Sequence, residues 1–283
     1  MKNFRIIFLS LSLLAMQYSL CAAEGPTQFD MGAEFSYIQY REPDFMENKG
    51  NMYGVFGTVT HRISENQPVK SAADIFGTNQ INAFKLDGRL SFGSVDYESQ
   101  GTGTLDDILD FIFEIRGLAG YDIPLENGPR LTPYLGLGYR YLNDDSSGKR
   151  TTTGAAGYER ESNYFYLPIG LEGLVNLNEG WSFGFVGEFD VFLMGRQVSH
   201  LSDAIAGLND ITNDQKSGYG LRGSMKLAKE TESLTFFVEP FVRYWKVDDS
   251  EISAVTYSGV LVGFGLEPEN NSTEYGARIG VNF

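Results

Sequence analysis

Apolar and polar residues alternate along most of this chain. Between Phe29 and Tyr37 the odd positions are apolar or aromatic, and the even positions are small or charged. A period of two residues predicts a β-strand with one apolar face and one polar face. After residue 24, the one stretch with a helical pattern is short and spans residues 72–76. We therefore predict an all-β protein.

The alternation predicts ten strands. They are assigned to residues 28–40, 51–62, 81–97, 110–122, 131–142, 162–176, 181–196, 218–228, 234–247 and 273–283. Pro168 and Pro240 fall inside two of them, and each lacks the N–H that a strand ladder uses. A β-bulge is one way in which a strand can accommodate each proline.

Short and long connections alternate between these strands. The short ones include residues 178–180 and 231–233, and the long polar ones include 143–161 and 248–272. Short periplasmic turns at one end and long extracellular loops at the other are typical of an antiparallel transmembrane β-barrel. Residues 63–80 break the rule, because they should form a short turn and are too many. The prediction is a single barrel of about ten strands, with eight or twelve as alternatives.

Charged residues lie on the face opposite the apolar one. In strand 110–122, Phe111, Phe113 and Ile115 share one face, and Glu114 and Arg116 share the other. A Lys or Arg facing lipid near the bilayer centre costs about 2–4 kcal/mol, so the charges should face the lumen. A soluble β-sandwich, the alternative, would bury the aromatic face and expose the charged one.

Sixteen charges lie on these inward positions, eight of each sign. The acids are Asp30, Glu34, Asp87, Glu114, Glu172, Glu188, Asp190 and Glu239, and the bases are Lys85, Arg89, Arg116, Arg140, Arg222, Lys226, Arg243 and Arg278. An unpaired charge in a confined lumen loses hydration free energy, so opposite charges should be neighbours. We expect a cross-strand network that fills the lumen.

The chain ends on apolar residues that step back by two from a terminal aromatic ring: Tyr275, Ile279, Val281 and Phe283. This pattern resembles the C-terminal assembly signal of Gram-negative outer-membrane proteins. The whole pattern is similar to small outer-membrane β-barrels of the OmpA-transmembrane and opacity-protein type. The resemblance covers the chain as architecture but only the last nine residues as a motif. It implies the fold and the outer membrane, and not one activity, because such barrels serve many functions.

The N-terminus has the features of an export signal. Lys2 and Arg5 precede an apolar run over residues 6–16, and small residues follow up to Ala23. We predict a cleavable signal peptide, residues 1–23, and a barrel domain, residues 24–283. Cys21 is the only cysteine, and Leu20 before it differs from the small residue usual in lipoproteins. The mature chain would then hold no disulfide and no thiolate site.

The chain has 22 Lys and Arg against 37 Asp and Glu, a net charge of -15. That balance excludes a nucleic-acid binder, which needs basic groups to replace phosphate counterions. Since the inward charges balance, the surplus acid belongs to loops, turns and termini. Solvation explains it most simply. The alternative is divalent cations that bridge loop carboxylates to lipopolysaccharide phosphates.

Candidate chemistry is sparse. His200 and Ser202 lie where a strand enters a long loop, a pattern that resembles the His-x-Ser-Asn core of lipid A deacylases. Asp203 stands where that pattern has Asn, so the orienting acid would have to be one such as Asp214. Omptin proteases need an Asp-Asp pair and an Asp-His pair at the rim. Residues 144–145 offer the first, but the chain has no His-Asp dipeptide.

We therefore expect a non-enzymatic outer-membrane barrel that anchors acidic surface loops, for envelope integrity or for surface interaction and adhesion. The first alternative is a narrow pore for ions or small solutes. The second is a lipid A deacylase or omptin-like hydrolase at the rim, built on His200. We expect no cofactor and no metal site. The expected partners are outer-membrane lipid, lipopolysaccharide and the barrel-assembly machinery.

Overall fold

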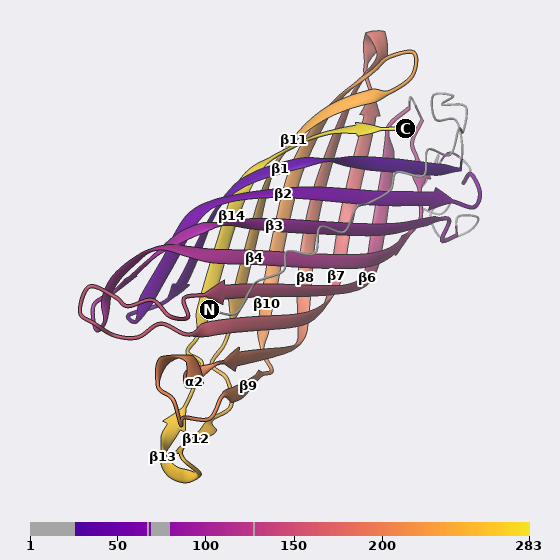
Figure 1. Ribbon diagram of the computed structural model, residues 1–283. Helices are drawn as coiled ribbons and strands as arrows, with labels where there is room; N and C mark the ends of the chain where they lie inside the picture. The colour runs from indigo at the N-terminus through magenta and orange to yellow at the C-terminus, as the bar shows by residue number, and fades with distance from the viewer. Residues whose placement is uncertain (1–25, 67, 69–79, 127) are drawn as a thin grey trace, which may run out of the picture.

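The computed structural model describes residues 26–66, 68, 80–126 and 128–283. Ten long antiparallel strands form one closed barrel (Figure 1), in the order β10-β11-β14-β1-β2-β3-β4-β6-β7-β8, with β8 pairing back to β10. The strands are β1 (Thr27–Glu42), β2 (Met46–Arg62), β3 (Ala83–Ser99), β4 (Gly103–Gly120), β6 (Arg130–Asp145), β7 (Glu159–Asn176), β8 (Trp181–Ser199), β10 (Gly218–Glu230), β11 (Thr235–Val247) and β14 (Asn270–Asn282). The prediction of an all-β chain with one ten-stranded antiparallel barrel is confirmed. The predicted signal peptide and the helical stretch 72–76 lie outside the described residues.

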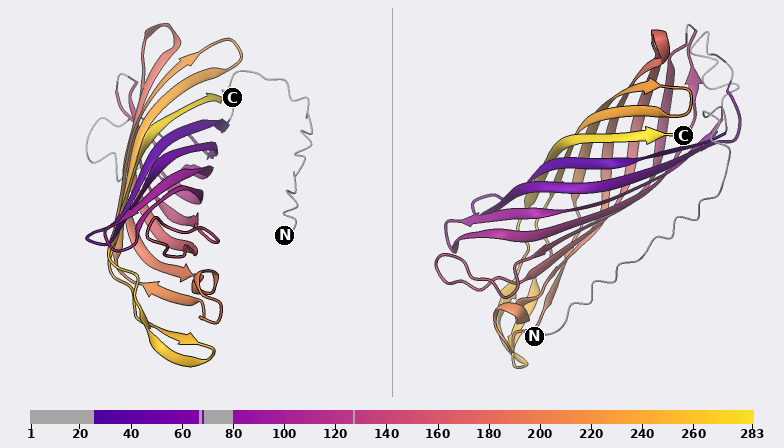
Figure 2. Two further views of the ribbon diagram at one scale, coloured as in Figure 1. Left: turned by 60° about the vertical axis from the view of Figure 1, so that its left-hand side comes forward. Right: turned by 45° about the horizontal axis from the view of Figure 1, so that its top comes forward.

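The two ends of the barrel differ. The turn end carries the connections 177–180 and 231–234 and the C-terminus. The loop end carries four short elements: α2 (Leu201–Ala204), β9 (Ile211–Gln215), β12 (Ser253–Tyr257) and β13 (Val260–Gly265). β12 and β13 form a hairpin that projects past the barrel, away from the C-terminus (Figures 1 and 2). A two-residue strand, β5 (Ile123–Pro124), pairs with β6.

Two connections at the loop end are short, although the predicted alternation of short turns and long loops places long loops at that end. Only residues 43–45 separate β1 from β2, and only residues 100–102 separate β3 from β4. The reason is that these strands continue beyond their predicted ends as paired hairpins, with Glu42 opposite Met46 and Ser99 opposite Gly103. The loops that extend beyond the barrel are therefore those between β6 and β7, β8 and β10, and β11 and β14.

The first and last strands close the barrel. β1 pairs with β14 from Asp30 opposite Asn282 to Arg41 opposite Asn271. Phe29 and Phe283 exchange two backbone hydrogen bonds of 3.0 and 3.1 Å, and their rings stack with centroids 5.7 Å apart. Closure leaves these two strands no free edge.

The two prolines are accommodated by gaps in pairing rather than by bulges. Pro168 has no partner on β6: Leu135 pairs with Ile169 and Gly138 with Tyr166, and the register is unchanged across the gap. Pro240 keeps its partner on β14 but has none on β10. The missing N–H opens the ladder on one side, and no extra residue is inserted there.

Outward and inward faces have the predicted contrast. Outward side chains are apolar and exposed, among them Leu137 at 65% and Ile279 at 68% exposure. All sixteen inward charges of the sequence analysis are buried or half-buried. No helix among the described residues is long and apolar enough to cross a membrane.

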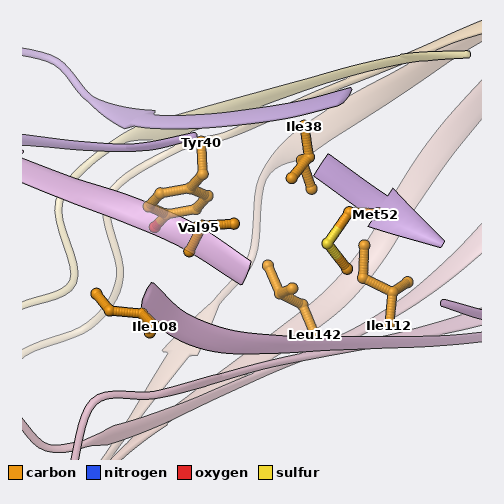
Figure 3. Packing of buried hydrophobic residues seen from close by; sticks show 7 residues of the cluster. All are labelled: Ile38, Tyr40, Met52, Val95, Ile108, Ile112 and Leu142. Carbon is orange, nitrogen blue, oxygen red and sulfur yellow. The ribbon is translucent and has the colours of Figure 1, made fainter. Parts of the chain in front are cut away.

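The lumen also holds large apolar side chains, which the sequence analysis missed. One cluster comprises Ile38, Tyr40, Met52, Val95, Ile108, Ile112 and Leu142. These side chains converge from strands β1, β2, β3, β4 and β6 (Figure 3). A second cluster comprises Tyr164, Tyr166, Phe192, Trp245 and Val247. On strands such as β1 and β4 the polar parity is therefore charged near the middle and apolar toward the loop end.

Candidate functional site: a filled lumen

The inward side chains change character along several strands. On β1 they run from Asp30 near the turn end through Glu34 and Ile38 to Glu42 at the loop end. Side chains two residues apart share a face, so the same order on neighbouring strands stacks into layers. The lumen thus has a vestibule at the turn end, a charged layer, an apolar layer and a polar rim at the loop end.

Arg89 lies at the centre of the charged layer. Its guanidinium lies 3.0 Å from Glu34, 2.8 Å from Glu114 and 2.9 Å from Glu274. These four side chains are 1–4% exposed. Arg243 and Arg278 also bind Glu34, at 2.7 and 2.8 Å. Five strands, β1, β3, β4, β11 and β14, are tied together by these contacts.

A second group is centred on Arg222 and Arg116. Arg222 contacts Asp190 at 2.7 Å and Glu188 at 3.0 Å, and it also binds Glu114. Arg116 contacts Asp87 at 2.8 Å and Glu188 at 2.7 Å. Glu114 binds both Arg89 and Arg222, so the two groups form one network.

The vestibule at the turn end is less filled. Lys85 binds Glu172 there, and Lys226 lies 2.6 Å from Asp30. These residues line a polar cavity of about 460 Å³ that is also lined by the turn residues Ser233 and Leu234. The vestibule ends at Arg116, Asp87 and Arg278, which line its inner side.

Two of the sixteen predicted residues have no ion pair in the part of the chain that the structure describes. Arg140 lies instead with its guanidinium 5.7 Å from the centre of the Tyr164 ring. Glu239 accepts a hydrogen bond of 2.6 Å from Ser224.

Glu274 is a lumen charge that the sequence analysis missed. It binds Arg89 and lies 3.2 Å from Arg243. It has the same parity as Arg278 on the last strand, and that parity was the available signal. With Glu274 the inward acids outnumber the eight predicted, so the predicted sign balance is not exact.

The apolar layer is joined to the charged layer by Tyr166. Its hydroxyl donates to Glu114 at 2.6 Å, and its ring lies 4.9 Å from the Trp245 ring, edge to face. The Arg222 guanidinium lies 5.3 Å from the centre of the same Tyr166 ring. The ring fits over Gly138, where an added Cβ would approach within 2.2 Å of it. Gly138 is therefore required for this packing.

The rim adds a group that the sequence analysis did not name. Arg160 of β7 lies 2.5 Å from both Glu42 and Glu267, and the Tyr40 hydroxyl donates to Glu267 at 3.0 Å. Asp110 and Asp144 face each other nearby, as a direct pair on β4 and β6.

His200 lies at the loop end, before α2. Its Nδ1 lies 3.2 Å from Asp210, and its Nε2 lies 3.7 Å from Glu161. Burial lowers the pKa of His200, but the hydrogen bond and charge of Asp210 outweigh it, so the pKa is raised overall. The predicted orienting acid, Asp214, is wrong, because Asp214 pairs with Arg196.

The contacts of Ser202 differ from those of an activated nucleophile. Its hydroxyl donates to Asp210 at 2.8 Å, and the backbone N–H of Ser202 also donates to Asp210. A nucleophilic serine needs its hydroxyl against the base, whereas Ser202 and His200 both use the same carboxylate. Among the described residues, no hydrogen bond or ion pair joins His200 to Asp144 or Asp145, the pair considered for an omptin-like site.

The terminal residues of the predicted assembly signal point outward. Tyr275 and Ile279 are 55% and 68% exposed, and Val281 and Phe283 are half-buried. The Tyr275 ring packs against Tyr37 of β1, with centroids 5.6 Å apart. Across residues 26–66, 80–126 and 128–283, no group of three or more His, Cys, Asp or Glu side chains is arranged to hold a metal ion.

The closed barrel with its apolar outer face and charged interior defines the class: an outer-membrane β-barrel. One solved structure supports this fold. The outer membrane protease OmpT from Escherichia coli is similar with a TM-score of 0.61 at 10% identity, over 91% of this chain and 95% of that one. The translocator domain of the autotransporter NalP from Neisseria meningitidis has a TM-score of 0.46 at 12% identity, over 93% and 90%. No family model and no curated protein matches the sequence, so no particular family is identified.

Proposed function

We propose that the protein is a non-enzymatic anchor in the outer membrane, closed to solutes, that displays its loops at the cell surface. The observation that supports this proposal is the continuity of the two filled layers. Arg89 and its carboxylates occupy the middle of the lumen. The Tyr166–Trp245 packing adjoins them on the side of the loop end. Side chains fill barrels of this size, and ion pairs and aromatic rings do so here.

The surface loops support the display role. The long connections carry their own short elements, α2, β9 and the β12–β13 hairpin, and they bind one another. Asn209 donates to the Ala254 carbonyl, and its amide oxygen accepts from the Thr256 N–H. Pairs of this kind give the loops a defined shape. Loops of defined shape favour a role in recognising a partner over a role in which acidic loops only keep the surface solvated. Outer-membrane lipid, lipopolysaccharide and the barrel-assembly machinery remain the partners that we propose.

A loop deletion tests this proposal. Residues 251–266 would be replaced by a short Gly-Ser linker in a strain that lacks the wild-type protein, and detergent resistance and cell adhesion would be measured. We expect the shortened barrel to assemble, because the deletion leaves the ten barrel strands intact. The envelope or adhesion phenotype should be lost with the loop. If the phenotype persists without the loop and the wild-type barrel conducts steadily in planar bilayers, the pore alternative replaces the anchor.

A further inference from the structure

The loop end of the barrel opens into a cavity of about 670 Å³. That volume lies within the range of about 300–1,000 Å³ that small-molecule sites occupy. Its upper wall is apolar and comes from separate loops: Phe45 before β2, and Phe264 and Leu266 from the β12–β13 hairpin and its end. Phe45 and Phe264 are 60% and 70% exposed. Large apolar side chains around one mouth provide a surface for an apolar group.

The floor of this mouth is acidic. Glu42, Asp144 and Glu267 line it, and Arg160 is the one base among the described residues that line it. Arg160 is already bound to Glu42 and Glu267, at 2.5 Å each. Asp144 has no ion pair of its own among the described residues, and it accepts a hydrogen bond from the side-chain amide of Asn48.

A second, smaller cavity of about 20 Å³ lies at this floor and shares Asn48, Asp144 and Arg160 with the mouth. Asp110 also lines it, directly opposite Asp144 in the β4–β6 register. Like charges that face each other across strands destabilise a sheet. The space suffices for one group the size of a water molecule.

Two acceptor atoms at the small cavity have no partner within the described chain. They are Oδ1 of Asp110 and Oδ1 of Asn48, and both residues are only 4% exposed. A buried acceptor without a donor costs free energy that a bound donor would recover. They line this cavity together with the Asp144 carboxylate and with Nε of Arg160, a buried donor that also has no partner within the described chain.

We propose that the mouth binds an organic cation, a primary ammonium group on an apolar body. The ammonium group enters the small cavity, where its three N–H donors meet Asp110, Asp144 and Asn48. The apolar body rests against Phe264 and Leu266. A water molecule could donate hydrogen bonds to these acceptors, but it would not neutralise the charge of the two facing carboxylates. A metal ion would satisfy the carboxylates but leave the apolar wall uncovered. This inference does not depend on the anchor role.

The test uses the barrel in lipid nanodiscs and 1-naphthylmethylamine, followed by its fluorescence. The matched neutral probe is 1-naphthalenemethanol, which has the same apolar body. We expect saturable amine binding, and binding of the alcohol weaker by about tenfold or more, since charged hydrogen bonds are the strong ones. Equal affinity for the two probes, or no saturable binding of the amine, would overturn the proposal.

Two variants and one control identify the site. Asp144→Asn should weaken amine binding by about tenfold or more while the barrel stays as heat-stable as the wild type, because it relieves repulsion from Asp110. Phe264→Ser, outside the barrel wall, should weaken both probes. Asp106→Asn removes one exposed acid at the same end and should change nothing. Wild-type amine affinity in Asp144→Asn would overturn the proposal, and displacement of the amine by micromolar calcium would assign the site to a metal ion instead.

Discussion

Arg89 and Glu274 form a two-point ion pair across the lumen. Nη1 and Nη2 of Arg89 lie 2.9 and 3.0 Å from the two carboxylate oxygens of Glu274. The two residues belong to β3 and β14, which β1 and β2 separate in the sheet. The contact therefore ties together strands that share no backbone pairing.

The first prediction concerns this network. Arg89→Met should lower the free energy of unfolding by about 3–5 kcal/mol, because it leaves Glu34, Glu114 and Glu274 buried with fewer partners. Urea unfolding of the refolded barrel in liposomes measures the change. The matched control is Arg196→Ala, which breaks the exposed pair with Asp214. An equal effect of the two variants would show that the lumen network does not stabilise the barrel.

The second prediction concerns the aromatic layer. Gly138→Ala should destabilise the barrel by about 1–3 kcal/mol, because its Cβ would displace the Tyr166 ring. The temperature at which the folded band disappears in detergent gels measures the loss. Gly117→Ala is the control, since nothing lies within 4 Å of its added Cβ. If both variants melt at the wild-type temperature, Tyr166 is not packed against Gly138.

The third prediction concerns topology. A short tag inserted after Gly259, at the tip of the β12–β13 hairpin, should be labelled on intact cells. Nothing lies within 4 Å of an added Cβ at Gly259. A tag in the turn 178–180 should be labelled only after the outer membrane is opened. Labelling in the opposite order would invert the proposed orientation.

The fourth prediction concerns His200. Its pKa is raised by Asp210 above the ordinary value of about 6.5. A raised folded-state pKa means that the ion pair contributes its full stability below about pH 6.5 and loses it as the pH rises through the raised pKa. An NMR titration in a His61→Gln background follows His200 alone. Asp210→Asn should lower the pKa of His200, and an unchanged titration would show that the two residues are not in contact.

The sequence was sufficient to predict the ten barrel strands and which face of each one points inward. Alternation is a local property, and a lipid-facing charge is costly enough to exclude the opposite parity, as Glu114 and Arg116 illustrate. The carboxylate partners of Arg89 could not be predicted in the same way, because two of them come from strands that do not pair with its own strand. Sequence parity places Glu34 and Glu274 inward but does not say which arginine each one meets.

Two features escaped sequence reasoning for different physical reasons. Inward apolar residues such as Ile38 and Trp245 have the same parity as the inward charges. A pattern that separates only an apolar face from a polar face therefore does not reveal the apolar layer that they form inside the barrel. The acid at His200 was misassigned because Asp210 and Asp214 lie in the same loop. Only the fold of α2 and β9 turns Asp210 toward the imidazole and Asp214 toward Arg196.

The central claim, a lumen closed by two layers, is tested most directly by single-channel recording in planar bilayers. The account predicts no steady conductance for the wild-type barrel. It predicts a measurable leak after combined Tyr166→Ala and Arg222→Ala substitution, since these side chains contact each other where the two layers meet. A large, steady and weakly selective conductance of the wild-type protein would contradict the account.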